Sequence, residues 1–117
     1  MILRFHTTDL PGLNGKDGLL RIHWSKKKTI MNRIMVLILE QKPKKMKRAQ
    51  VKMTNYYGNN HLDWDNMAAK CKLFFDALVA LKIIPDDSPE YIVQPFEMYQ
   101  EKVKMKDTRI EFEFTKV

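Results

Sequence analysis

The chain contains one cysteine, Cys71, and three histidines among its 117 residues. A single cysteine excludes an internal disulfide framework and indicates a reducing compartment, and we expect its side chain in the core. His6, His23 and His61 lack the spacing of metal ligands, so a zinc site is not expected. The sequence also has no glycine-rich phosphate-binding loop and no serine or cysteine within a catalytic triad. These absences exclude the common nucleotide-binding and covalent-catalysis sites.

Long apolar segments are missing as well. The best candidate, residues 34–39, is far shorter than the roughly 20 residues of a membrane span. Arg4, His6 and Asp9 interrupt the N-terminus, so no signal peptide is expected. Hydrophobic residues make up 44% and charged residues 30% of the chain, which is typical of a soluble globular protein. The length predicts a single domain over residues 1–117, and we expect a cytoplasmic location.

Acidic residues are scarce in the first half of the chain. Residues 1–52 contain 13 Lys/Arg against three acidic residues, which gives a net charge of +10. Residues 53–117 contain 8 Lys/Arg against 11 acidic residues, a net charge of −3, so the whole chain carries +7. This asymmetry favours a basic part that attracts nucleic acid. A solvated lysine-rich surface is the alternative interpretation.

The hydrophobic periodicity predicts an α+β fold. Residues 1–7 are expected to form a short strand, residues 9–18 a loop, and residues from Leu19 to about Gln41 a helix. After a basic linker at 42–48, we expect a strand at 50–57, a helix from Asp65 to about Lys82, and strands at 91–98 and 108–115. The predicted order is β-α-β-α-β-β, a small mixed sheet with the helices packed on it.

The helix from Asp65 to about Lys82 has aspartates at both ends. Asp63 and Asp65 precede it, and Asp86 and Asp87 follow it. On a helical wheel of about 100° per residue, Lys72 and Asp76 fall within about 20° of Asp65, on a polar stripe. The opposite, apolar side is expected to face the core and contains Met67, Cys71, Phe74, Phe75, Leu78 and Leu81.

Three other residues of this helix have a place on the same wheel. Ala69 and Ala80 fall within about 60° of Asp65, and small side chains beside the stripe would let a ligand come close. Lys70 falls near about 140°, at the boundary of the core, and is therefore the weaker candidate for chemistry.

Each acidic residue also has a simpler explanation. Asp63 or Asp65 can cap the helix, which accounts for one of them but not for both. Asp86 and Asp87 can belong to an ordinary turn, and Asp76 can pair with Lys72 on the surface. Trp64, between the first two aspartates, either stacks on a base or packs against the sheet. Together, however, Asp-Trp-Asp-Asn, a helix and Asp-Asp could bring three carboxylates to one place.

Converging carboxylates repel one another, and a bound cation relieves that repulsion. Mg²⁺ prefers oxygen ligands and retains several waters. Bound against a phosphodiester, such an ion lowers the pKa of a water and stabilises charge on the phosphorus and leaving oxygen. A nearby lysine such as Lys72 can stabilise further transition-state charge. The pattern therefore indicates a metal-dependent nuclease.

This stretch resembles the RusA family of Holliday-junction resolvases and its phage relatives. The matching residues are Asp63-Trp64-Asp65-Asn66, then Lys72, then Phe75-Asp76-Ala77-Leu78, then Asp86-Asp87. The match covers roughly 30 residues, and an early Leu-Pro-Gly-Leu-Asn loop extends it loosely. The family's lysine lies one turn after the second aspartate, whereas Lys72 lies two turns after Asp65. The family's arginine run before the first aspartate is replaced here by Gly58-Asn59-Asn60-His61-Leu62.

The resemblance implies a small homodimer with two active sites, each of which cuts one strand of a four-way DNA junction with Mg²⁺, or with Mn²⁺ as a substitute. Asp63, Asp65 and Asp87 would be the metal-binding carboxylates and Lys72 the catalytic lysine. Asp86 and Asp76 are possible additional members. It also implies a role in recombination and repair in a bacterial or phage-infected cell. Without the arginine run, phosphate contacts are expected from Lys26, Lys27, Lys28, Lys44, Lys45, Lys47 and Arg48.

Two alternatives remain open at this point. One is a DNA-binding relative of the same fold that selects branched DNA but does not cut. The other is a small structural or regulatory module whose acidic turn binds no metal.

Overall fold

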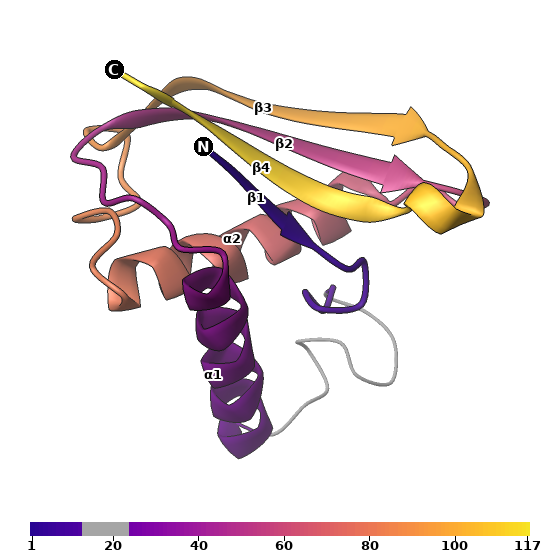
Figure 1. The fold of residues 1–117 in the computed structure, drawn as a ribbon, viewed down its shortest axis with the longest axis horizontal. Coiled ribbons are helices and arrows are strands. Elements are labelled where there is room, and N and C mark those ends of the chain that lie inside the picture. Colours follow the sequence, from indigo (N-terminus) through magenta and orange to yellow (C-terminus); the bar gives the residue numbers. More distant parts are fainter. Residues whose placement is uncertain (13–23) are drawn as a thin grey trace.

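The computed structural model describes residues 1–12 and 24–117 as a four-stranded sheet with two helices on one side (Figure 1). The order along the chain matches the predicted β-α-β-α-β-β order, with a short 3₁₀ helix, η1, before the last strand. The elements are β1 (Ile2–Phe5), α1 (Trp24–Glu40), β2 (Ala49–Tyr57), α2 (Trp64–Ala80), β3 (Ile92–Lys102), η1 (Met105–Asp107) and β4 (Arg109–Lys116). The predicted helix start at Leu19 and most of the predicted 9–18 loop lie outside the described residues.

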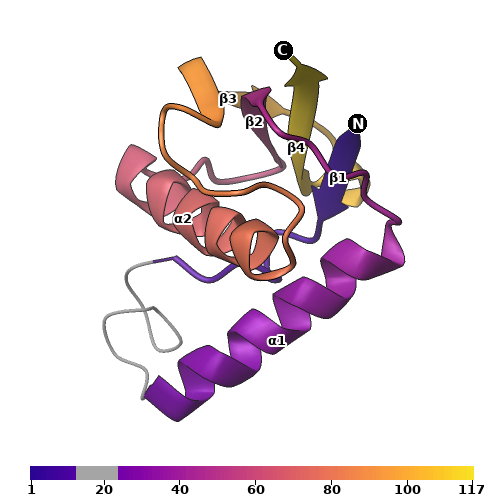
Figure 2. The same ribbon diagram turned by 90° about the vertical axis from the view of Figure 1, so that its left-hand side faces the viewer.

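The sheet is mixed and has the strand order β1-β4-β2-β3. Strand β4 is antiparallel to both β1 and β2, whereas β2 and β3 run parallel. A parallel pair needs a long crossover, and α2 supplies it between β2 and β3. The crossover places α2 against the sheet, as Figure 2 shows, with α1 beyond it on the same side.

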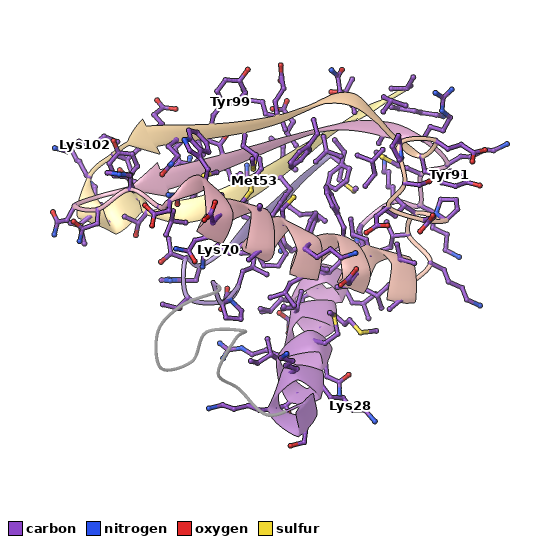
Figure 3. All side chains as sticks on the ribbon, turned by 180° about the vertical axis from the view of Figure 1, so that it is seen from behind. Lys28, Met53, Lys70, Tyr91, Tyr99 and Lys102 are labelled. Atoms are coloured by element: carbon purple, nitrogen blue, oxygen red, sulfur yellow. The ribbon has the colours of Figure 1, made fainter. Side chains whose placement is uncertain are left out.

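One hydrophobic core lies between the sheet and the helices. In β4, Ile110, Phe112 and Phe114 are buried while their neighbours are more exposed, so the predicted alternation is confirmed. The ring of Phe74 on α2 stacks on Phe112 with 3.8 Å between centroids. Met53 of β2 points into the same layer (Figure 3). Buried area of this kind supplies most of the free energy that favours folding.

Strand β3 is longer than the predicted 91–98 segment, and it contains Pro95. The pairing of β2 with β3 is irregular there, because Gln50 pairs with Val93 but Lys52 pairs with Glu97. Proline has no backbone N–H to donate, so it is tolerated only at a bulge or on an edge strand. Both conditions are met at Pro95, and the strand continues beyond it to Lys102.

No helix formed by residues 1–12 and 24–117 lies on the outer face of the sheet (Figures 1 and 2). Glu111 accepts hydrogen bonds there from Arg4 at 2.9 Å and from Arg109 at 3.1 Å. Arg109 also lies over the ring of Tyr56, 4.0 Å from its centroid. Tyr99, which is 46% exposed, projects from this side (Figure 3). The outer face is therefore a charged surface with aromatic side chains among the ion pairs.

A lysine with a positive φ lies two residues after the end of each helix, Lys42 at 52° and Lys82 at 59°. At the end of α2, the N–H groups of Lys82 and Ile83 donate to Val79 and Leu78. These two bonds form a Schellman motif, which satisfies the last carbonyls of a helix and turns the chain back. The turn returns residues 83–87 toward the middle of α2. None of the described helices is long and apolar enough to cross a membrane.

Candidate functional site

The polar stripe predicted on α2 is present at its centre. The Lys72 ammonium lies 2.9 Å from Asp76 Oδ1 and 2.9 Å from Asp87 Oδ2. Asp76 is one turn along the same helix, but Asp87 is 15 residues away and reaches Lys72 because the Schellman motif turns the chain back. The three side chains form one cluster, which we call the Lys72 cluster.

The charges of the Lys72 cluster stabilise one another. Hydrogen bonds from Lys72 to Asp87 and to Asp76 hold the pKa of the lysine well above its ordinary value. The hydrogen bond from Lys72 lowers the pKa of Asp87 in turn. Lys72 is therefore a fixed positive charge and Asp87 a fixed negative charge at neutral pH. The lysine side chain is 65% exposed, so a ligand can reach it.

The other two predicted metal ligands lie at the start of α2. Asp63 is the N-cap residue, but its side chain makes no capping hydrogen bond. Asp65 is exposed in the first turn, where the helix dipole favours a negative charge. Trp64 between them is 54% exposed and so does not pack against the sheet. Capping does not account for Asp63, and both carboxylates face solvent.

Oxygen-only, solvent-exposed donors are the type of ligand that Mg²⁺ takes, commonly as one or two carboxylates with several waters. Asp76 and Asp87 are the carboxylates that the structure brings together, with the Lys72 ammonium between them. Over residues 1–12 and 24–117, no three His, Cys, Asp or Glu side chains gather closely enough to hold one metal ion. Asp86 is exposed beside Asp87 in the turn.

Lys70, the weaker candidate on the helical wheel, is 6% exposed. Its ammonium donates to the backbone carbonyl of Thr7 at 3.2 Å and to that of Leu10. Burial lowers the pKa of this lysine. Lys70 therefore anchors the turn after β1 against α2 and does not face the Lys72 cluster. Ala69, expected beside the polar stripe, is buried as well, at 8% exposure, whereas Ala80 is exposed.

Gln100 of β3 fixes the position of Leu62, the residue immediately before Asp63. The sequence did not reveal this role. The Gln100 side-chain amide donates to the Leu62 carbonyl at 2.6 Å and accepts from the Leu62 N–H at 2.8 Å. It also accepts from the buried Asn55 amide at 3.1 Å. Leu62 immediately precedes Asp63, so two strands of the sheet determine where α2 begins. No pattern in the sequence links a glutamine to a residue 38 positions earlier.

The predicted phosphate contacts fall into two groups. Lys26, Lys27 and Lys28 lie in the first turns of α1, and Lys28 is far from the sheet in Figure 3. Lys44, Lys45, Lys47 and Arg48 are exposed in the linker that follows α1. Most of α1, a 17-residue helix about 25 Å long, lies between the two groups. The two groups are therefore separate basic surfaces.

The linker lysines border a groove of about 430 Å³ at the C-terminal end of α2. Lys45, Lys47 and Lys82 line it together with apolar side chains such as Met46 and Val79. The Met46 N–H donates to the Ile83 carbonyl at 2.8 Å, which holds the linker against the end of α2. Lys82 thus joins the linker group, although the sequence did not single it out.

Cys71 is 3% exposed and lies in the core as predicted, and burial raises the pKa of its thiol. Neither a protein-family model nor a curated protein sequence matches the chain. The likeness to the RusA family thus rests on the residues of α2 and the two segments that flank it.

Proposed function

We propose that this protein is a divalent-metal-dependent endonuclease that nicks branched DNA, of the type that resolves four-way junctions. The observation that carries the proposal is the contact between Lys72 and Asp87 at 2.9 Å. The RusA resemblance assigned catalytic roles to both residues from their order alone. Lys72 and Asp87 are 15 positions apart in the sequence, and their contact supports the assignment of both to one site.

The carboxylates that would bind a cation in the proposed site are Asp63 and Asp65 at the start of α2, and Asp87 beside Lys72 with Asp76 and Asp86 as further ligands. Since no three of the described acidic side chains gather at one point, one or two of them with several waters would hold each ion. A bound Mg²⁺ or Mn²⁺ would supply a water of lowered pKa and Lewis acidity toward a phosphate oxygen. Lys72 keeps its proton because of its carboxylate partners, and it stabilises negative charge on the reacting phosphate. Asp87 orients the lysine through the bond between them.

The basic residues position the DNA in this proposal. The linker group (Lys44, Lys45, Lys47 and Arg48) and the α1 group (Lys26, Lys27 and Lys28) contact phosphates, which gives affinity without sequence preference. Each neutralised phosphate steepens the salt dependence of binding by close to one log unit per log unit of salt. A homodimer would present two sites to the two-fold symmetry of a four-way junction.

The test is a nicking assay on a synthetic four-way junction and on a linear duplex of the same sequence, with Mg²⁺ and with EDTA. We expect paired, symmetric nicks in the junction only when Mg²⁺ is present. Asp65→Asn and Asp87→Asn should abolish the nicks. Glu101→Gln, which neutralises an exposed acid at the end of β3, is the matched control and should cut at the parental rate.

Two results would contradict the proposal in different ways. Tight, junction-selective binding without nicks would identify the non-cutting relative. Neither binding nor nicks would leave a structural module of the same fold. Parental cutting by Asp65→Asn would remove that residue from the metal site.

A further inference from the structure

A pocket of about 410 Å³ opens beside the start of α2. Its walls come from the end of β2, the loop at residues 58–62, the turn after β1 and η1. This volume lies within the range of small-molecule sites, which is about 300–1,000 Å³. The pocket is separate from the Lys72 cluster and from the basic groove, since it shares no lining residue with either.

The side chains in this pocket are suited to a neutral aromatic ligand. Tyr57, Leu62 and Met105 supply apolar and aromatic surface, and Asn59 and Asn60 supply amide groups. Among the described residues, no lysine, arginine, histidine, aspartate or glutamate lines it. The two asparagine side chains make no hydrogen bond to the described part of the protein and are exposed. Amide groups of this kind pair with the edges of nucleobases, and aromatic rings stack on their faces.

The pocket lies close to Asp63 and Asp65 at the start of α2. Asn60 is three residues before Asp63, and the Gln100 clamp on Leu62 fixes the chain between them. A phosphodiester at Asp63 and Asp65 would therefore place a neighbouring nucleotide near the pocket. The described lining offers an asparagine-rich and apolar surface and no cation to a phosphate, which favours entry of the base.

We propose that this pocket binds an unpaired nucleobase of the DNA strand next to the phosphate that is cut. The inference rests on the proposed function and adds the feature that selects branched over linear DNA. Bases of an intact duplex are stacked and paired, so they cannot enter without extrusion. At a branch point an unpaired or weakly stacked base is available at a smaller cost in free energy.

Photocrosslinking tests the location of the base. The full chain is mixed with a four-way junction that carries 5-iodouracil as an unpaired base at the branch point, in EDTA so that no cutting is needed. After irradiation, mass spectrometry should find the nucleotide on Tyr57 or Met105. Crosslinks found only on Trp64 or on other surfaces would overturn the proposal. So would the absence of crosslinks when a gel shift shows that the junction is bound.

Affinity measurements test the role of the amides. Asn59→Leu with Asn60→Leu should weaken binding of the junction with the unpaired base about tenfold, the order expected for loss of base contacts. Affinity for a linear duplex should not change. Asn32→Leu on α1 exchanges another exposed asparagine and is the control.

A substrate with an abasic site in place of the unpaired base completes the design. The parent should bind the abasic junction about as weakly as the double variant binds the junction with the unpaired base. The double variant should bind the abasic junction with no further loss of affinity. If the double substitution lowered the affinity for both junctions equally, the amides would act on the fold or on phosphates. The proposal would then fail. Crosslinks in the pocket without nicks in the earlier assay would contradict the proposed cutting but not the pocket. Nicks with crosslinks elsewhere would contradict the pocket alone.

Discussion

Lys70 and Lys72 are separated by one residue on α2, yet they lie in opposite environments. Lys70 is buried, with backbone carbonyls as partners and a lowered pKa. Lys72 is exposed, with two carboxylates as partners and a raised pKa. A helix turns by about 200° over two residues, which is enough to move a side chain from the solvent to the core. The same residue type thus has two environments on one helix, a buried one that holds the turn after β1 and an exposed one to which we assign the proposed chemistry.

The largest expected effect is on catalysis. Lys72→Met should lower the nicking rate by about 100-fold or more, since it removes a positive charge beside the reacting phosphate. Lys70→Met, assayed at a temperature where it remains folded, should cut within a few-fold of the parent. Single-turnover nicking of the four-way junction measures both. The reverse ranking would assign the chemistry to Lys70.

The second effect is on stability and has the opposite ranking. Lys70→Met should lower the free energy of unfolding by about 2 kcal/mol, because the Thr7 and Leu10 carbonyls lose a charged donor. Lys72→Met should lower the free energy of unfolding by less than about 1 kcal/mol, because exposed ion pairs usually contribute no more than that. Urea unfolding followed by tryptophan fluorescence compares the two. Equal losses would mean that the two environments do not differ in energy.

A smaller effect is expected for Asp76→Asn, which removes only the partner of Lys72 on the same helix. Pairs four residues apart contribute roughly 0.3–0.5 kcal/mol. We expect a loss of stability of about that size and a nicking rate within a few-fold of the parent, since Asp87 still holds the lysine. A loss of cutting as large as that of Asp87→Asn would instead make Asp76 a metal ligand.

The smallest effect is in the pH dependence of stability, and its sign differs between the two lysines. For Lys70, the unfolded chain binds more protons than the native one between the lowered native pKa and the ordinary pKa of 10.5, so the stability of the parent relative to Lys70→Met rises with pH in that window. For Lys72, the contribution is present below 10.5 and is lost as pH rises through the raised native pKa. Asp87 adds a loss on the acid side, as pH falls below 3.8 through its lowered native pKa. Unfolding curves of the parent and both variants at a series of pH values measure these slopes, and slopes of the same sign would contradict the contrast.

The sequence predicted those parts of the fold that depend on local pattern. Alternation at Ile110, Phe112 and Phe114 identified β4, and the 3.6-residue period identified α2 and its core side. The same period placed Lys72 beside Asp76, which the structure confirms. Local patterns of this kind are visible because one face of a helix or strand must be buried.

The features that the sequence did not reveal depend on contacts between distant segments. The wheel placed Lys70 at the core boundary, but its carbonyl partners are 60 or more positions earlier and come from a turn without a recognisable motif. The Gln100 clamp on Leu62 is likewise a tertiary contact between neutral groups. The extension of β3 beyond Met98 depends on its pairing with β2, in which residues 98–102 lie beside residues 53–57.

The bulge at Pro95 has a further consequence, for self-association. A free strand edge offers a row of N–H and C=O groups on which another chain can add as a strand. In this sheet one edge is β3, interrupted at the bulge, and the other is β1, only four residues long. Both edges are thereby poor templates for aggregation or for a continuous sheet across two copies. The homodimer proposed above would therefore form through faces of the molecule rather than through strand pairing.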